Sequence, residues 1–419
     1  MAGDLRSRLK RIREIGLAPA SELKPPEHSA APAESHETND AKKKAPAEKS
    51  AAERFAKGRA AKKNIPVQGP PSVRRGKAAC APGNFRAPKD FSDWEAAGYF
   101  VLHRALVKPL RRPLARELPA ALPLLAPDLG NSGRPFSPDG KDRLGPGDFL
   151  FFDLETTGLS GGAGTVAFLA AFGTFIAGGD LLKIDQFLLL DYPGEADFID
   201  AVLRFIASCG DVYLTTYNGK SFDSQILKTR CLMNGFRPLQ LPQLDLLHPA
   251  RRLWKRILSG CSQAVIELEV LGLDRGEDIS GAFAPDIWFR YLRSHPASSP
   301  PEGSAGAADS PYDGFGAEET ALNLVKICDH NVRDIAGLAA LFQAFTEIAA
   351  DPLKGSGRYN CDTEHLAMVW RREYGAASAE KYLPFDELEK MSETAEALLE
   401  SAAADWPRAG LRLAFDRFR

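Results

Sequence analysis

The central part of the chain alternates between short apolar runs and segments with helical periodicity. Three apolar runs come first and predict a meander of three strands, GDFLFFDLE (147–155), TVAFLAAFGTF (165–175) and KIDQFLLLDY (183–192). The pattern then predicts, in order, a helix (195–208), a strand (211–217), a helix (221–235), a short strand (243–249), several helical segments and one long helix (318–347). This order predicts an α/β fold, with a mixed β-sheet flanked by helices and its first strand near the centre.

The segments on either side of this region differ in composition. Residues 1–90 are poor in large apolar side chains and predict a disordered basic tail, because such a segment cannot bury enough surface to offset chain entropy. Leu5, Leu9 and Ile12 recur there at helical spacing among basic residues. Two interpretations remain for them, a short amphipathic helix that docks on nucleic acid or a partner, or a frayed solvated helix.

Further boundaries follow from the same pattern. Residues 91–146 are expected to be a lead-in segment that packs on the core, with strand-like character at 98–107. Residues 147–347 would form the main domain, with a low-complexity loop insertion at 295–317. Residues 360–419 are Ala-rich and predict a small helical C-terminal region.

Charge and cysteine usage narrow the functional classes. Residues 1–90 contain 20 Lys and Arg against 10 Asp and Glu, whereas the remainder contains 33 against 45. A basic tail on an acidic body suggests a polyanionic partner. No run of about 18 apolar residues, secretory signal or transit peptide is present, so we expect a cytoplasmic protein with no membrane span. The 6 cysteines form no CxxC pair, which argues against a zinc site.

The first strand ends in the pattern Asp153-Leu154-Glu155. Strand side chains alternate, so both carboxylates point to one face and Leu154 to the other. Two acids in an apolar strand repel each other unless a cation lies between them. The alternative is a strand end that simply faces solvent.

Two further segments carry acids at positions where they could join a binding site. Asp223 opens the helix after the strand 211–217, at the carboxyl edge of the sheet where α/β folds bind ligands, although it is also an ordinary first-turn acid. His330 and Asp334 lie four apart on the long helix and share a face, either as site residues or as a surface pair. Four carboxylates in three segments suit two Mg²⁺ or Mn²⁺ ions, which can activate water and stabilise the leaving oxygen in phosphodiester cleavage.

The motifs DLETTGL, NGKSFD and HNVRDIAGL, in this order and spacing, resemble the three motifs of the DEDD exonuclease superfamily, which has the RNase H-like fold. LDLLHPARRLWK, CSQAVIELEVLGLDR and DISGAFAPDIWFRYL look like the bacterial YprB-like ribonuclease H-like branch. The resemblance covers about half of the chain. It implies metal-dependent 3′→5′ exonuclease chemistry in which Asp153, Glu155, Asp223 and Asp334 are the metal carboxylates.

His330 departs from the superfamily pattern. The last motif of the superfamily has either His with four residues before Asp, or Tyr with three, whereas here three residues separate His330 from Asp334. One helical residue corresponds to about 100° of rotation. The resemblance therefore implies a metal role for Asp334, and it leaves open whether His330 acts as the general base.

Contacts to nucleic acid are expected from turns and cations around these acids. The residues are Thr156, Thr157, Gly158, Asn218, Lys220, Ser221, Arg251 and Arg252. Turn amides can bind phosphate oxygens, and Arg251 and Arg252, with His248, either contact phosphate or stabilise the domain. The expected partner is DNA or RNA with a single-stranded 3′ end. An endonuclease or structure-selective nuclease, and a nucleic-acid-binding scaffold with a weakened site, are the alternatives. The oligomeric state is left open.

Overall fold

The computed structural model describes residues 87–119, 121–129, 144–158, 164–295, 316–380 and 385–405, all within the compact unit Gly69–Arg419. The expected tail up to residue 86, most of the expected loop insertion (296–315) and the last residues (406–419) lie outside the described residues. None of the helices in the described ranges has the combined length and hydropathy needed to cross a membrane.

In the described part of the chain, seven strands form one mixed sheet in the order β1-β2-β5-β4-β3-β6-β7. Their bounds are β1 Glu95–Gly98, β2 Val101–Pro109, β3 Phe149–Thr156, β4 Ala167–Ile176, β5 Leu181–Leu189, β6 Tyr213–Thr216 and β7 Gln243–Asp245. Neighbours from β1 to β3 are antiparallel, whereas β3, β6 and β7 are parallel to one another. The prediction of a mixed sheet with its first apolar strand away from the edges is confirmed.

The sheet begins earlier in the chain than the expected boundary at residue 147. β2 pairs with β5 over its full length, from Val101 opposite Leu189 to Pro109 opposite Leu181, and β1 adds an edge strand beside β2. The lead-in segment therefore contributes two strands to the sheet itself, in addition to packing on the core.

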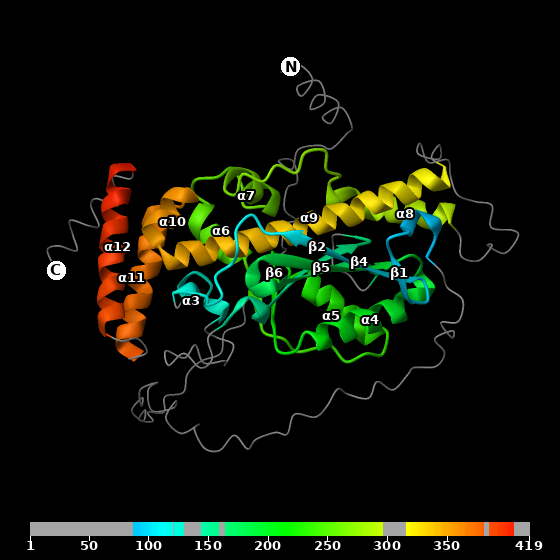
Figure 1. Ribbon diagram of the computed structural model, residues 1–419, viewed down its shortest axis with the longest axis horizontal. Coiled ribbons are helices and arrows are strands. Elements are labelled where there is room, and N and C mark those ends of the chain that lie inside the picture. Colours follow the sequence, from blue (N-terminus) through cyan, green and yellow to red (C-terminus); the bar gives the residue numbers. More distant parts are fainter. Residues whose placement is uncertain are drawn as a thin grey trace, which may run out of the picture. The chain divides into compact units, whose positions relative to one another are not determined.

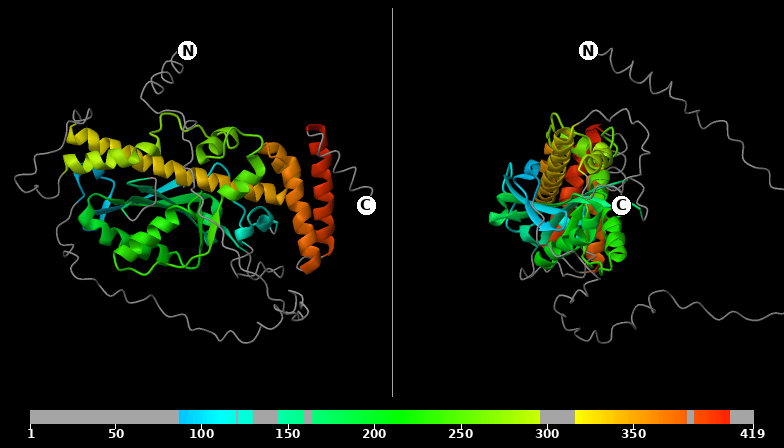
Figure 2. Two further views of the ribbon diagram at one scale, coloured as in Figure 1. Left: turned by 180° about the vertical axis from the view of Figure 1, so that it is seen from behind. Right: turned by 90° about the vertical axis from the view of Figure 1, so that its right-hand side faces the viewer.

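Helices cover both faces of the sheet. The longer helices are α4 Glu195–Ser208, α5 Asp223–Met233, α6 Leu247–Trp254, α8 Ala284–Ser294, α9 Ala317–Ala350, α11 Thr363–Glu380 and α12 Phe385–Asp405, with the short α3 Leu122–Leu125, α7 Gln263–Glu269 and α10 Pro352–Arg358 between them. α4 and α5 pack on one face, and α9 crosses the other (Figures 1 and 2). α5 ends at Met233 with Asn234 as its C-cap, and Gly235 follows in the left-handed region at φ 77°, so the helix lies within the predicted range 221–235.

β3 is buried on both faces because its side chains alternate between two cores. Phe149 and Phe151 belong to the core that contains the C-terminal part of α9, and the Phe151 ring lies 5.7 Å from Phe342. Leu150, Phe152 and Leu154 belong to the core beneath α4 and α5. Asp153 and Glu155 continue the odd-numbered face and so point toward α9.

The C-terminal helices extend the α9 core. Trp254 at the end of α6 is fully buried, packs 5.5 Å from the Phe345 ring of α9 and donates a hydrogen bond to the Tyr359 carbonyl. Leu366 and Trp370 of α11 join the same core, and α11 pairs with α12. The predicted helical C-terminal region is thus present up to residue 405 and is part of this core.

Candidate metal centre

Parallel pairing brings the ends of β3 and β6 to one edge of the sheet. Phe149 to Phe151 pair with Tyr213 to Thr215, so both strands end on the same side. Asp153 and Glu155 lie at the end of β3, and the ladder with β4 becomes irregular between Glu155 and Thr156. The segment after β6 leads into α5 at Asp223. The predicted meeting of these acids follows from the sheet topology.

A tight turn aims Asp223 at this edge. Asn218 has a positive φ of 65°, and its backbone amide donates to Asp245 Oδ1 at 2.8 Å. Gly219 has no room for a side chain, since a Cβ there would lie 2.7 Å from both Asp223 Oδ2 and Thr216 Cβ. Asp245 is buried, and at 3.3 Å it also accepts from the Lys220 amide. β7 thus fixes the turn that carries Asp223.

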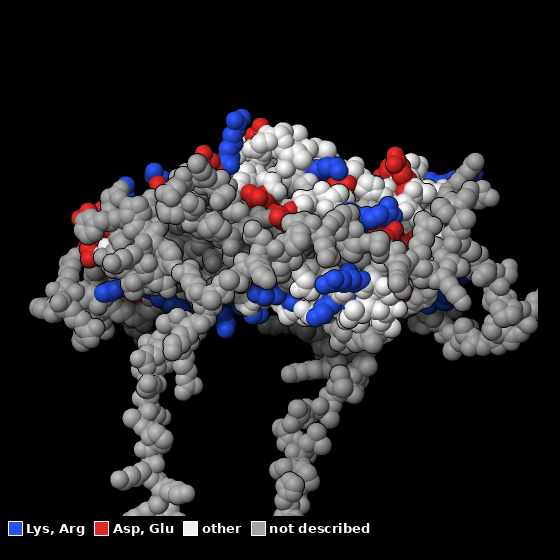
Figure 3. All heavy atoms as spheres, turned by 90° about the horizontal axis from the view of Figure 1, so that it is seen from below, with Lys and Arg blue, Asp and Glu red and all other residues white. Residues whose placement is uncertain are grey.

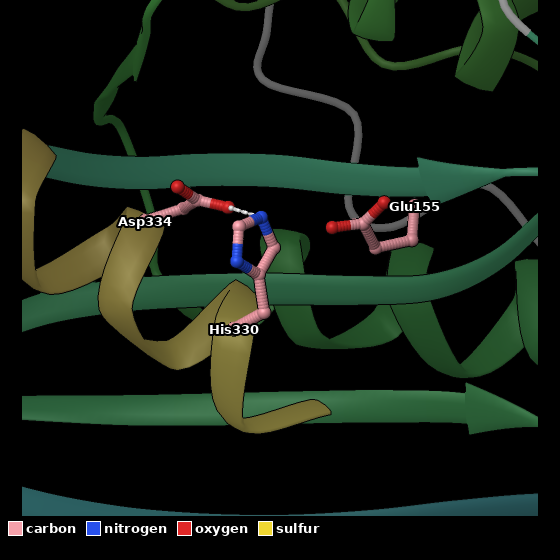
Figure 4. Close-up of side chains that lie close together, drawn as sticks. All are labelled: Glu155, His330 and Asp334. Atoms are coloured by element: carbon pink, nitrogen blue, oxygen red, sulfur yellow. Dashed lines mark ion pairs between the residues drawn. The ribbon is translucent and has the colours of Figure 1, made fainter. Parts of the chain in front are cut away.

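α9 closes the site from the other side. His330 and Asp334 share one face of α9, and the His330 ring and the Glu155 carboxylate extend toward the same space (Figure 4). All five residues proposed for chemistry line one cavity of about 270 Å³. Its lining consists of Asp153, Leu154, Glu155, Thr156, Tyr217, Asn218, Phe222, Asp223, Gly281, Pro285, His330 and Asp334.

Burial and neighbouring acids raise the pKa of three carboxyl groups in this cavity. Burial, followed by the charges of Asp334 and Asp223, raises the pKa of both Asp153 and Glu155 well above the ordinary range. Burial raises the pKa of Asp223 to about 7, with additional contributions from Asp245 and Asp334. In the described part of the chain, no cationic side chain forms an ion pair with Glu155. These carboxylates therefore share an environment that a bound cation would stabilise.

His330 is held between two acids. Its Nδ1 lies 2.7 Å from Asp278 Oδ2, and its Nε2 lies 3.2 Å from Asp334 Oδ2. Burial works against ionisation of Asp278, but hydrogen bonds and charges from His330 and Arg333 outweigh it and lower its pKa. Gly281 leaves room for the ring, because a Cβ there would lie 3.0 Å from Nε2. The histidine thus faces the cavity despite its unusual spacing.

A buried polar chain reaches Asp153 from the sheet. The Asn331 amide donates to Asp153 Oδ2 at 2.7 Å and accepts from Gln186 Nε2 at 2.9 Å. The Arg104 guanidinium donates in turn to Gln186 Oε1 at 2.8 Å. Asn331 and Gln186 are fully buried. This chain fixes the Asp153 carboxylate through residues that do not line the cavity.

The sequence analysis did not identify four residues that support the site, Asn331, Asp278, Asp245 and Arg275. Arg275 Nη2 donates to Asp334 Oδ1 at 2.6 Å. A signal was available for the segment that carries Arg275, because Glu267 of the same segment packs on Gly337. Gly337 interrupts a long helix three residues after Asp334, and an isolated helical glycine often marks a close approach by another segment.

The expected nucleic-acid contacts are distributed unevenly around the cavity. Thr156 and Asn218 line it. The Thr156 hydroxyl donates to the Gly158 carbonyl at 2.9 Å, and Thr157 Oγ1 accepts from the Val166 amide at 2.9 Å. These contacts stabilise the start of the glycine-rich loop, whose residues 159–163 lie outside the described residues.

The remaining expected contacts are exposed. Ser221 donates to the Asn218 carbonyl at 3.2 Å, and Lys220 forms an ion pair with Asp128 at 3.2 Å. Arg252 donates to the Leu125 carbonyl at 3.4 Å, whereas Arg251 lies near Tyr217, a residue of the cavity wall. Where described side chains are visible on the face in Figure 3, Lys and Arg lie among Asp and Glu. Local cations, rather than one uniformly basic surface, are therefore available there.

The donor set fits a hard divalent cation. One ligand atom from each of Glu155, His330 and Asp334 lies within 4.8 Å of the other two. Asp153 and Asp223 line the same cavity, and carboxylate oxygens are the ligands that Mg²⁺ and Mn²⁺ prefer. Burial and neighbouring charges raise the pKa of Asp153, Glu155 and Asp223, which is consistent with a site in which a cation compensates the charge of their ionised forms.

Comparison with known proteins agrees with this fold. Residues 150–346 match the family model of the RNase_H superfamily. The chain is also similar to "Uncharacterized protein YprB" of Bacillus subtilis (strain 168), with 37% identity over 150 residues. That match covers 35% of this chain and 35% of the relative, so the chain spans about a third of the relative's length. Together with the mixed sheet and its helices, the match indicates an RNase H-like fold over residues 150–346.

Proposed function

We propose that this protein is a metal-dependent nuclease that hydrolyses phosphodiester bonds, acting as a 3′→5′ exonuclease of the DEDD type. The observation that carries the proposal is the convergence of Asp153, Glu155, Asp223 and Asp334 in one cavity. These acids come from β3, the start of α5 and α9, which are far apart in the sequence. The RNase H-like domain supports a nucleic-acid substrate.

The carboxylates and the histidine would have different roles in the reaction. The four carboxylates would hold two Mg²⁺ or Mn²⁺ ions. Such ions neutralise the charge that develops on the attacking and leaving oxygens. His330 would orient and deprotonate the attacking water. Asp278 supports that role, since its contact with Nδ1 leaves Nε2 directed to the cavity.

The substrate would enter as a single-stranded 3′ end. Thr156 and Asn218 line the cavity and can contact the terminal nucleotide. Thr157, Gly158, Lys220 and Ser221 lie in the turns next to them. Arg251 and Arg252 would add charge for the following phosphates, an effect that salt weakens.

The test is a time course on 3′- and 5′-labelled single- and double-stranded DNA and RNA, with Mg²⁺ or Mn²⁺. The Asp153→Asn variant is expected to lose at least about 100-fold in rate, because it removes a carboxylate that would hold the ions that stabilise developing charge. Asp180→Asn is the matched control, since Asp180 is exposed in the turn between β4 and β5. Circular dichroism verifies folding. Undiminished cleavage by Asp153→Asn would contradict the assignment.

The same assay separates the alternatives. An exonuclease leaves a circular single strand intact, whereas an endonuclease cuts it. A scaffold with a weakened site would bind labelled strands tightly in Mn²⁺ and release no product. Progressive shortening of the linear strands from the 3′ end, with EDTA abolishing it, is the outcome that we expect.

A further inference from the structure

Both oxygens of the Asp334 carboxylate contact nitrogen atoms of basic side chains. Oδ1 accepts from Arg275 Nη2 at 2.6 Å, and Oδ2 lies 3.2 Å from His330 Nε2. His330 reaches Asp334 from the preceding turn of the same helix, whereas Arg275 arrives from the segment after α7. The orientation of this carboxylate therefore depends on a residue about 60 positions away in the chain. Arg275 is the last residue of the motif CSQAVIELEVLGLDR, to which the sequence pattern assigned no role.

Arg275 is itself fixed in place. Its Nε donates to Glu267 Oε2 at 2.5 Å and its Nη2 to Glu267 Oε1 at 2.8 Å, and its Nη1 lies 3.6 Å from Asp278 Oδ2. Burial works against its charge, but the contacts with Glu267 and Asp334 outweigh burial and raise its pKa above the usual range. The guanidinium is a permanent cation, and its Nε, Nη1 and Nη2 atoms each contact a carboxylate.

Glu267 is seated directly against α9. The carboxylate is buried and packs on Gly337, where a Cβ would lie only 1.7 Å from Oε1. Gln263, one turn earlier on α7, donates to Glu267 Oε1 at 2.8 Å and to the Asp334 carbonyl at 2.7 Å. α7 is thus anchored to α9 next to Asp334, through contacts that hold both the backbone and the carboxylate of that residue.

We propose that Arg275, locked by Glu267, is the positioning residue for Asp334 and sets the affinity of the site for its metal ion. The inference rests on the proposed metal-dependent function. By holding Oδ1, Arg275 leaves Oδ2 directed to the space shared with Glu155 and His330. It also offsets part of the negative charge of the acid cluster. Partners that hydrogen-bond to a metal carboxylate order it, and their loss costs about 10- to 100-fold in metal affinity.

The test measures Mn²⁺ binding to the full chain by electron paramagnetic resonance of free Mn²⁺. Arg275→Met is expected to weaken Mn²⁺ binding by about 10- to 100-fold. Arg275→Lys should rescue it only in part, since an ammonium cannot bridge Glu267 and Asp334 with a planar fork. Glu267→Gln, which keeps the volume, provides a second variant that loosens Arg275. Oligonucleotide cleavage measured over a range of substrate concentrations should show a lower kcat with little change in KM.

Arg204→Met is the matched control. Arg204 of α4 is exposed and pairs with Asp200 of the same helix, and neither residue lines the cavity. Its removal should leave Mn²⁺ affinity nearly unchanged. Unaltered Mn²⁺ binding in both Arg275→Met and Glu267→Gln would overturn the inference, and so would tighter binding, which would make Arg275 a competitor of the metal.

The outcomes also separate the inference from the proposed function. If wild-type protein degrades nucleic acid while the Arg275 and Glu267 variants bind Mn²⁺ normally, only the inference fails. If wild-type protein shows no cleavage but these variants lose Mn²⁺ affinity, the positioning role holds and the nuclease proposal fails.

Discussion

Asp153 and Glu155 on β3 meet Asp334 of α9 in one cavity, yet their surroundings differ. On the strand side, the described contacts provide Asp153 with a neutral amide from Asn331 and provide Glu155 with no cationic partner. On the helix side, Asp334 contacts Arg275 and His330. Asp153 and Glu155, the strand half of the site, thus have no cationic partner among the described contacts. Asp334, the helix half, is ordered by two basic side chains.

This difference predicts that the two halves contribute differently to the binding of a cation. In the strand half, burial and then the charges of Asp334 and Asp223 raise the pKa of Asp153 and Glu155, so a cation bound there would stabilise their ionised forms. The helix half is ordered before any cation arrives, through α7 and its contacts with α9. Asp223 belongs with the strand half, since burial also raises its pKa, to about 7. Variants that act on one half should therefore differ in kind from variants that act on the other.

The largest expected effect concerns the stability of the protein in EDTA. The pKa of Asp223 is about 7 in the folded protein, above that of an unfolded Asp, so the folded state binds more protons between about pH 4 and 7. The free energy of unfolding should therefore fall as pH rises through this window and level off above it. Asp223→Asn should remove this component, up to about 4 kcal/mol at pH 8.

Urea unfolding at pH 5, 6, 7 and 8 measures this prediction, with Asp180→Asn as the control that keeps the wild-type slope. Saturating Mn²⁺ should reduce the fall in the wild-type protein, because the cation compensates the ionised acids. A metal-free stability that rises with pH, or an equal slope in Asp223→Asn, would contradict the assigned role of the strand half.

The parts of the site that sequence could predict are those governed by local geometry. The two-residue period of a strand places Asp153 and Glu155 on one face, and the helical period places His330 and Asp334 together. These rules hold because β3 and α9 are regular over the positions concerned. The meander 149–189 was predictable for the same reason, since its three strands are consecutive and apolar.

The supporting residues could not be predicted from the sequence, because their contacts join segments that are distant along the chain. Glu267 and Arg275 belong to a stretch that reads locally as a short helix and a loop, and nothing local shows that it packs on Asp334. β2 likewise pairs with β5 about 80 residues later, so its membership of the sheet depends on tertiary packing. Such contacts form only in the folded chain, so no local pattern in the sequence indicates which segments they join.

A substitution at Gly337 tests the packing of α7 on α9 that supports the helix half. Gly337→Ala would place a Cβ against the buried Glu267 carboxylate, so it should cost about 1–3 kcal/mol of stability and weaken Mn²⁺ binding by displacing Arg275. Gly357 in α10 is the matched control, since a Cβ there meets nothing within 4 Å. Gly357→Ala should be neutral or stabilise by about 0.5–1 kcal/mol. Urea unfolding and Mn²⁺ titration measure both, and equal effects of the two variants would refute the close packing of α7 on α9.

The smallest expected effect comes from the neutral support of the strand half. Asn331→Leu keeps the approximate volume and removes the donor to Asp153 together with the acceptor for Gln186, so it should cost about 1–2 kcal/mol in EDTA. Mn²⁺ affinity should fall less than in Arg275→Met. Asp153 retains its place through the buried strand on either side, and the removed partner is uncharged. Weaker Mn²⁺ binding in Asn331→Leu than in Arg275→Met would contradict this prediction. The strand half would then be the part that depends on side-chain support, and the roles of the two halves would be exchanged.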